Sequence, residues 1–303
     1  MSSIYLNPAR ADPVYNVPKN SKTPKACRAG GCGVEYTKCQ VDLPRLQRKA
    51  RLYVGIPEKK EEGERFPVLY MHDGHNVFSD EDAFDGVSWG LIQAYRDWPG
   101  LPRIIVVGLE CANGGRRFDE YAGFPIAHPG LDRFIPKPVG GKGDLYLDTI
   151  VSQIKPMIDQ NYPTIPSPEY TGMVGSSMGG VITHYAALTR TGVFSRFGSL
   201  SGAFFVSESS VLHATERATL TGVHRFFLSV GTRECGVGDQ EEYVRVNQAV
   251  FAALSKKMSP ERLRFEIVED GIHHESAWAK VLPSVIRFLF SDIGKGLQHP
   301  PAR

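Results

Sequence analysis

Short runs of apolar residues, separated by turn-forming residues, recur along the chain from about residue 41 onwards. The runs FPVLYM at 66–71 and IIVVGL at 104–109 are continuous and bounded by Gly, Pro or charged residues. Such runs are typical of strands that are buried on both faces, as in a parallel sheet. Further runs of this kind lie at residues 50–56, 170–174, 197–200, 226–230 and 263–268.

Segments between these runs carry apolar residues at helical spacing. In residues 146–158, the apolar side chains of Ile150, Ile154 and Ile158 recur every four positions. The other predicted helices are residues 89–95, 178–188, 242–254 and 276–290. Because strands and helices alternate, the pattern predicts an α/β fold with a doubly wound, mostly parallel sheet and helices on both faces.

Three parts of the chain differ in pattern, which predicts the domain organisation. Residues 1–40 form a basic extension that contains Pro, Lys and Cys and is expected to be irregular, and residues 41–291 form a single domain. Residues 292–303 form a C-terminal tail. Within the domain, residues 111–144 are a Gly/Pro-rich stretch of the length expected of a lid or binding loop, and residues 203–222 are expected to form a short cap.

Composition and charge are those of an ordinary soluble globular protein. The chain has 303 residues, is 42% hydrophobic, and carries 35 Lys and Arg against 33 Asp and Glu. A net charge of +2 gives no basic field, so we expect neither nucleic acid nor a membrane surface as a partner. The N-terminal sequence MSSIYLNPAR has no apolar run that could form the core of a signal peptide, and no stretch of the chain approaches the ~20 apolar residues of a membrane-spanning helix. The expected location is the cytoplasm. The oligomeric state is not predicted.

Five cysteines are an odd number, so we do not expect disulfides to hold the fold. Cys27, Cys32 and Cys39 could supply three thiolate ligands to zinc. Their spacing misses the C-x-x-C pattern of structural zinc sites and no fourth ligand is evident, so free thiols on a loop are the favoured interpretation. No metal site is predicted.

The sequence Gly175-Ser-Ser-Met-Gly179 matches G-x-S-x-G, with a predicted strand before it and a predicted helix after it. In this context the central serine lies on a tight strand-to-helix turn with its Oγ exposed at the edge of a sheet. Ser177 is the predicted nucleophile, with Ser176 as the alternative. The N–H of Met178 is the first predicted donor to an oxyanion. The competing interpretation is a Gly/Ser-rich turn that merely starts a helix.

A serine nucleophile needs a base, and after this turn the expected chain order is Ser, then Asp or Glu, then His. His273 and His274 follow the predicted strand at 263–268 and precede the last helix. Glu234 lies just past the strand at 226–230, and Asp239 is the rival acid in the same loop.

The loop after the strand at 66–71 is expected to supply a second oxyanion donor. Its sequence is His72-Asp73-Gly74-His75, in which glycine lets the chain turn and expose backbone N–H groups. The predicted donor is the N–H of Gly74 or His75. For His72 and Asp73 we expect a structural role in holding this loop.

Taken in order, several segments resemble a known family of α/β-hydrolase-fold esterases, those related to enterochelin esterase and the YbbA-like hydrolases. The resemblance covers residues 41–291 and is carried by RLYVGIP, FPVLYMHDGHNVF, GVSWG, IIVVGLE, RRFDEYAGF, GSSMGG, LSGAF, SVGTRE and HHESAW. It implies an α/β-hydrolase fold. The family's H-x-E-x-x-W element falls on His273, Glu275 and Trp278, which selects His273 as the base, and its VGT-x-E element supports Glu234. Arg117, Glu120 and Tyr121 match a stretch near the family's cleft.

These observations predict a serine hydrolase that cleaves carboxylic esters through an acyl-enzyme, with Ser177, His273 and Glu234 as the catalytic triad and no cofactor. The substrate is a small-molecule ester. The resemblance implies a catecholate siderophore ester, and a carbohydrate acetyl or feruloyl ester is the alternative. Trp89, Arg117 and Tyr121 are candidates to bind an aromatic or anionic ligand, and the alternative for each is a scaffold or solvated residue. The hypothesis from another class is a non-catalytic binding protein of the same fold that uses its basic N-terminal extension.

Overall fold

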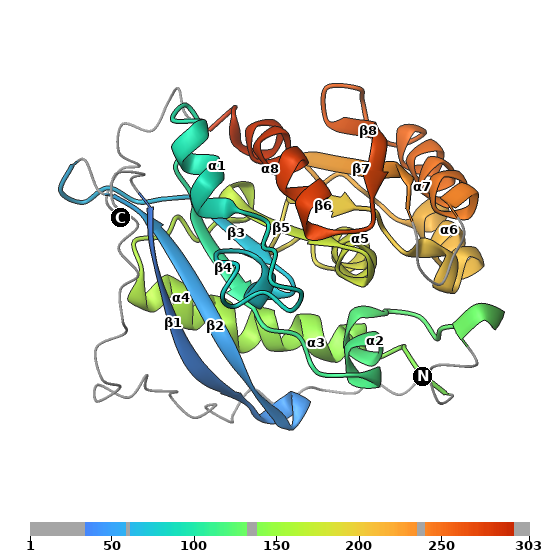
Figure 1. Ribbon diagram of the computed structural model, residues 1–303, viewed down its shortest axis with the longest axis horizontal. Coiled ribbons are helices and arrows are strands. Elements are labelled where there is room, and N and C mark those ends of the chain that lie inside the picture. The colour runs from blue at the N-terminus through green and yellow to red at the C-terminus, as the bar shows by residue number, and fades with distance from the viewer. Residues whose placement is uncertain (1–33, 59–60, 132–137, 235–239, 294–303) are drawn as a thin grey trace, which may run out of the picture.

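The fold is built on one sheet of eight strands. The computed structural model describes residues 34–58, 61–131, 138–234 and 240–293. The strands lie in the order β1-β2-β4-β3-β5-β6-β7-β8 (Figure 1). Their bounds are β1 Val34–Leu43, β2 Arg48–Pro57, β3 Val68–Met71, β4 Ile105–Leu109, β5 Thr171–Ser176, β6 Arg196–Leu200, β7 Arg225–Arg233 and β8 Leu263–Ile272.

Six of these strands run parallel, and the two at the N-terminus do not. β1 pairs with β2, and β2 with β4, in antiparallel register, whereas β4, β3, β5, β6, β7 and β8 are all parallel to their neighbours. The carboxyl ends of the parallel strands therefore meet at one edge of the sheet, where loops can bring distant residues together. The prediction of a mostly parallel sheet is confirmed.

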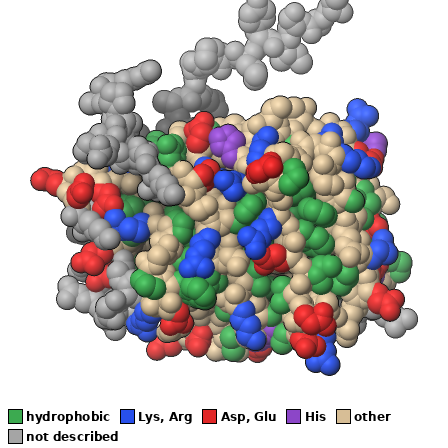
Figure 2. All heavy atoms as spheres, turned by 90° about the horizontal axis from the view of Figure 1, so that it is seen from above, with side chains coloured by type: hydrophobic (Ala, Val, Ile, Leu, Met, Phe, Trp, Pro, Cys, Tyr) green, Lys and Arg blue, Asp and Glu red, His purple; other side chains and the backbone are tan. Residues whose placement is uncertain are grey.

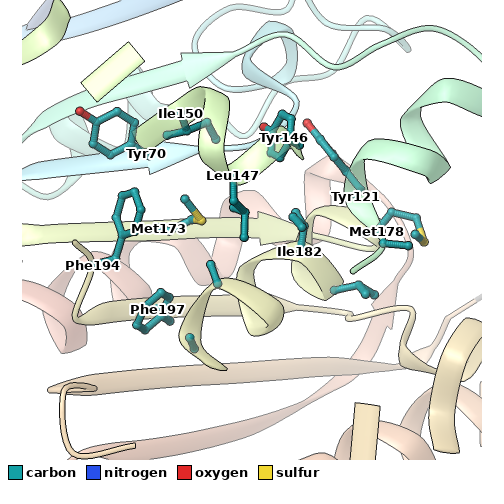
Figure 3. Close-up of a cluster of buried hydrophobic side chains, with 14 of the residues drawn as sticks. Tyr70, Tyr121, Tyr146, Leu147, Ile150, Met173, Met178, Ile182, Phe194 and Phe197 are labelled. Carbon is teal, nitrogen blue, oxygen red and sulfur yellow. The ribbon is translucent and has the colours of Figure 1, made fainter. Parts of the chain in front are cut away.

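Helices cover both faces of the sheet, as predicted. They are α1 Leu91–Asp97, α2 Gly115–Tyr121, α3 Gly143–Thr149, α4 Lys155–Asn161, α5 Met178–Thr189, α6 Glu208–Arg217, α7 Gln240–Ser255 and α8 Glu275–Phe290. Apolar side chains of α1 and α8 pack in one core cluster, and those of α3 to α7 pack in a second cluster. Figure 3 shows part of the second cluster, where Leu147 and Phe194 lie on either side of Met173 of β5 in the view drawn.

Three elements differ from the sequence expectation. β1 begins at Val34, so the predicted irregular extension gives way to strand before residue 40. Val34 and Tyr36 alternate onto one face and pack in one core cluster, whereas Val41 packs in the other. The predicted helix at 146–158 is part of a longer helical segment in which one π-helical turn, Ile150–Ile154, joins α3 to α4. Residues 111–144 contain α2 in addition to loop.

The surface carries both signs of charge. On the face drawn in Figure 2, Lys and Arg side chains are interspersed with Asp and Glu, and hydrophobic side chains form small separate patches. This mixture agrees with the near-zero net charge of the whole chain. Within the described residues, every helix is too short or too polar to cross a membrane.

Candidate active site

Ser177 lies between the last residue of β5 and the first residue of α5, in a backbone conformation that side chains rarely adopt. Its φ and ψ angles are 56° and −123°. The close packing behind the turn explains why small residues flank it: a Cβ added to Gly175 would lie 2.6 Å from the carbonyl carbon of Gly179. A non-glycine residue held at positive φ is a strained feature that the surrounding structure must enforce, and such residues concentrate at functional sites.

His273 and Glu234 are directly hydrogen-bonded. His273 follows β8 and Glu234 follows β7, and the Nδ1 of His273 lies 2.7 Å from the Oε2 of Glu234. The carboxylate is fully buried, and its other oxygen accepts a hydrogen bond of 2.8 Å from the N–H of Gly231. With Nδ1 engaged as the donor to a carboxylate, the Nε2 of His273 is the nitrogen that remains to accept a proton.

Two aromatic rings fix the orientation of the His273 imidazole. The ring of Tyr243, from α7, lies 5.0 Å from it between centroids, and the ring of Trp278, from α8, meets it edge-on at 5.1 Å. The indole N–H of Trp278 donates a hydrogen bond of 2.9 Å to the Oγ of Ser201, just after β6. The preceding residue, Leu200, accepts a hydrogen bond of 3.0 Å from the N–H of Ser177. This series of contacts joins the His273 loop to the serine turn.

The neighbouring histidine has other partners. The Nδ1 of His274 accepts a hydrogen bond of 3.1 Å from the N–H of Ser276, which caps the first turn of α8. Its Nε2 lies 3.3 Å from the Oδ2 of Asp85. His274 is therefore a capping residue, whereas its neighbour faces the buried acid. Asp239, the rival acid, lies outside the described residues.

The loop after β3 is held by a buried network of polar contacts. Asp73, which has a φ of 51°, forms a bidentate ion pair with Arg117 through two hydrogen bonds of 2.8 Å. Burial alone would raise the pKa of Asp73, but the charge and hydrogen bonds of Arg117 hold it below its usual value. The backbone N–H of Asp73 donates to the hydroxyl of Tyr121 at 3.0 Å. The aspartate thus stays ionised and anchors the loop.

Gly74 and His75 follow in a 3₁₀ turn, Gly74–Asn76. A Cβ at Gly74 would lie 2.3 Å from the carbonyl carbon of Gly108, so this loop sits against the backbone of β4 at a distance that only glycine permits. Met178, which carries the other predicted oxyanion donor, is the first residue of α5 and is buried. All three predicted donors therefore lie on turns that follow β3 and β5, two neighbouring parallel strands.

His72 packs behind the serine turn. It is 4% exposed, and its Nδ1 lies 2.9 Å from the hydroxyl of Tyr146. A Cβ at Gly175 would lie 2.8 Å from the Cδ2 of His72, which shows how closely this ring approaches the turn. Burial lowers the pKa of His72 to about 3, so the imidazole is neutral at physiological pH. These contacts agree with the expected structural role.

The three residues predicted to bind substrate occupy different surroundings. Trp89 is 3% exposed and packs against Trp278 with ring centroids 5.7 Å apart, and Tyr121 is fully buried. Arg117 keeps 24% of its side-chain surface exposed beside its ion pair with Asp73. Substrate contact stays a prediction for Arg117, whereas the surroundings of Trp89 and Tyr121 are those of residues that support the loops from the interior.

Sequence reasoning missed several residues around the site. Tyr146 and Tyr243 contact His72 and His273 from helices far along the chain, and no local pattern distinguishes them from ordinary core tyrosines. Asn76 lies within the segment HDGHNVF, and its sequence pattern predicted no role for it. Its position five residues past the end of β3, in the same loop as the predicted oxyanion donors, was the available signal. Of the three cysteines considered as zinc ligands, Cys27 and Cys32 lie outside the described residues. Cys39 lies on β1, where burial raises the pKa of its thiol.

One edge of the mostly parallel sheet presents a strained strand–serine–helix turn and a histidine that is bonded to a buried carboxylate. This combination defines an α/β-hydrolase-fold protein. The family model described as "Putative esterase" matches residues 44–289, and the chain belongs to this esterase family. The resemblance stated from the sequence is confirmed.

Similar proteins agree with this membership. YbbA from Bacillus subtilis (strain 168) is 27% identical over 247 residues, which are 80% of this chain and 92% of YbbA. An endo-1,4-beta-xylanase/feruloyl esterase from Xylanibacter ruminicola is 28% identical over 234 residues, 76% of this chain but 27% of that protein. The crystal structure of the enterobactin esterase FES from Shigella flexneri with enterobactin aligns at a TM-score of 0.66 and 18% identity, covering 85% of this chain and 59% of that chain. The chain thus spans less than two thirds of the last two proteins.

Proposed function

We propose that the protein is a serine esterase in which Ser177 is the nucleophile, His273 the general base and Glu234 the acid that orients it. The observation that carries this proposal is the 2.7 Å hydrogen bond from His273 Nδ1 to the fully buried Glu234. A buried carboxylate in this place fixes the imidazole tautomer with Nε2 unprotonated and stabilises the imidazolium that forms during reaction. The strained conformation of Ser177 after β5 supports the same assignment.

The proposed reaction has two halves. Nε2 of His273 takes the hydroxyl proton of Ser177 as its Oγ attacks the ester carbonyl, and the oxyanion accepts hydrogen bonds from the N–H of Met178 and of Gly74 or His75. The tetrahedral intermediate collapses, and His273 gives the proton to the leaving alcohol, which departs and leaves an ester on Ser177. The same imidazole then takes a proton from water, whose oxygen attacks the acyl carbonyl. The bond to the Oγ of Ser177 breaks, His273 returns the proton to Oγ, and the acid is released.

The decisive test compares two adjacent serines. Ser177→Ala should lower kcat for an activated acyl ester by at least about a thousandfold, because only binding and the oxyanion donors remain. Ser176→Ala is the matched control and should keep most of the activity, since its side chain is buried at the end of β5. Circular dichroism checks that both variants are folded. The reverse pattern would move the nucleophile to Ser176.

A fluorophosphonate probe separates the esterase from a non-catalytic binding protein of the same fold. The probe reacts with an activated serine, so the wild-type chain should be labelled and Ser177→Ala should not. An unlabelled wild-type chain would favour the binding protein.

We further propose an ester of a catecholate siderophore as the substrate class. Its support is the fold similarity to an esterase that is named for enterobactin and was crystallised with it. A feruloyl ester of a sugar is the second candidate, favoured by the similarity to a chain named in part as a feruloyl esterase. A panel of p-nitrophenyl acyl esters, feruloyl sugars and a catecholate trilactone distinguishes them. A kcat/KM for the trilactone that exceeds the others by orders of magnitude is expected, and preference for the feruloyl sugar would reverse the order.

A further inference from the structure

Asn76 and Glu275 form a hydrogen bond that the proposed reaction does not use. The Nδ2 of Asn76 donates to the Oε1 of Glu275 at 2.7 Å, between residues 199 positions apart in the chain. Asn76 ends the 3₁₀ turn that begins at Gly74, and Glu275 begins α8 two positions after His273. The contact therefore joins the loop of the predicted oxyanion donors to the loop of the predicted base.

Every polar group of Asn76 is engaged. Its N–H donates to the carbonyl of Asp73 at 2.8 Å, and its carbonyl accepts from the N–H of Trp89 at 2.7 Å. Its side-chain Oδ1 accepts from the N–H of Phe84 at 2.9 Å, which leaves Nδ2 for Glu275. An amide with both ends bonded and only 8% of its surface exposed is held in one orientation. The Nδ2 that donates to Glu275 is therefore held in one position.

The surroundings of Glu275 make its carboxylate dependent on the hydrogen bond from the Nδ2 of Asn76. Burial raises the pKa of its carboxyl group, and the nearby Asp73 carboxylate acts in the same direction. A backbone hydrogen bond at Glu275 itself, together with His274 and His273, acts in the opposite direction. A carboxylate in such surroundings depends on the donors it has, because an unsatisfied charged oxygen is costly away from water. Loss of the Asn76 amide would therefore disturb the start of α8 and, with it, the His273 loop.

The sheet does not fix the spacing of these two loops directly. The loop of residues 73–76 follows β3, and the loop of residues 273–275 follows β8. Three strands lie between β3 and β8 in the sheet order. No backbone ladder therefore joins them directly, and small displacements along four strand pairs can add. Proton transfer and oxyanion stabilisation tolerate errors of only about 0.5 Å in the relative position of catalytic groups. A direct contact between the loops removes this source of error.

We propose that Asn76 and Glu275 are positioning residues, whose hydrogen bond sets the distance between the oxyanion loop, residues 73–76, and the base loop, residues 273–275. This inference rests on the proposed function. Neither Asn76 nor Glu275 is proposed to contact the substrate. Its consequence is that the bond contributes to kcat, with little effect on KM, because it arranges groups that act in the transition state.

Alanine variants test the contact. Asn76→Ala and Glu275→Ala should each lower kcat by about 10- to 100-fold with KM little changed. Glu275→Gln keeps an acceptor oxygen in place and should recover most of kcat. Glu81→Ala, an exposed acid of the nearby loop, is the matched control and should behave as wild type. Circular dichroism and urea unfolding verify that each variant is folded under the assay conditions.

Asn76→Asp supplies a readout that a purely structural role would not move. This substitution places a second carboxylate against that of Glu275. The other charged or titratable groups that act on Glu275 are Asp73, His273 and His274, and Asp73 is itself paired with Arg117. At pH 7 the two carboxylates repel, whereas protonation of either one restores a donor and an acceptor. The ratio of variant to wild-type kcat should therefore rise as the pH falls from about 7 to 5. The ratio for Asn76→Ala should not change with pH.

The double variant Asn76→Ala/Glu275→Ala completes a cycle of four proteins. If the two residues act through one bond, the double variant should be no slower than the slower single variant. Losses that multiply, or a wild-type kcat in Asn76→Ala, would overturn the positioning role while an inactive Ser177→Ala leaves the proposed function standing. An active Ser177→Ala would instead overturn the proposed function, and the same cycle would still report whether the bond contributes to the ester hydrolysis observed.

Discussion

At the scale of single residues, Glu234 shows how a charge is held in the interior of this protein. Its two oxygens accept from two different donors, the backbone N–H of Gly231 and the ring nitrogen of His273. A fully buried carboxylate is tolerated only when both oxygens are satisfied in this way. The same arrangement leaves a single tautomer for the imidazole, so one side chain serves both stability and the proposed chemistry.

Glu234→Gln is expected to separate these two effects. The glutamine oxygen can still accept from Gly231, but its amide nitrogen faces the Nδ1 of His273 and favours the tautomer with the proton on Nε2. We expect kcat to fall by about a thousandfold or more with KM little changed, measured by steady-state hydrolysis. A small effect would mean that the imidazole is held by another group, and the assignment of the acid would then be withdrawn.

At the scale of elements, α8 brings together several parts of the candidate site. The helix begins at Glu275, directly after the paired histidines, and its first turn supplies Trp278, whose ring packs against His273. Farther along, its apolar side chains pack in the same core cluster as those of α1. The cap of His274 and the packing of the helix side chains thus hold the start of α8 in place. The base loop, which precedes the helix, is held in place with it.

The two adjacent histidines should respond differently to removal. His274→Ala removes the cap of α8 and should lower the free energy of unfolding by about 0.5–2 kcal/mol while keeping most of kcat. His273→Ala should abolish acylation, because it removes the imidazole that is bonded to the buried acid. Urea unfolding and single-turnover acylation measure the two effects. Equal losses of acylation in both variants would contradict the assignment of His273 as the base.

At the scale of the whole molecule, two buried neutral histidines make the fold sensitive to acid. Burial lowers the pKa of both His72 and His184 to about 3. Their pKa in the unfolded chain is about 6.5, so the unfolded state binds more protons between these values. Their contribution to stability is complete above pH 6.5 and is lost as the pH falls toward 3.

His184→Leu tests this dependence away from the candidate site. His184 lies on α5 with its Nε2 2.8 Å from the Oγ1 of Thr215, and its substitution removes one of the two titrations. Between pH 6 and pH 4, the slope of unfolding free energy against pH should decrease by up to about 1.4 kcal/mol per pH unit. An unchanged slope in His184→Leu would show that this imidazole is charged in the folded state.

The sequence by itself determined the features that depend on local pattern. Continuous apolar runs and helical spacing predicted the alternating strands and helices, because a buried strand and an amphipathic helix each impose their own period on the chain. The G-x-S-x-G turn predicted the place of Ser177, since its backbone requires small residues on either side at fixed offsets. The chain order after it indicated His273 or His274 as the base and Glu234 or Asp239 as the acid. The family resemblance then selected His273 and supported Glu234, and these roles remain predictions.

Tertiary structure alone decided how distant segments meet. The pairing of Asn76 with Glu275, the contact of Tyr146 with His72 and the ion pair of Arg117 with Asp73 join residues between 44 and 199 positions apart. No periodicity encodes such pairs, because they depend on the close packing of side chains between loops that only the folded sheet brings together. For the same reason Trp89 and Tyr121, which looked like ligand-binding residues in the sequence, take interior positions that their local sequence could not indicate.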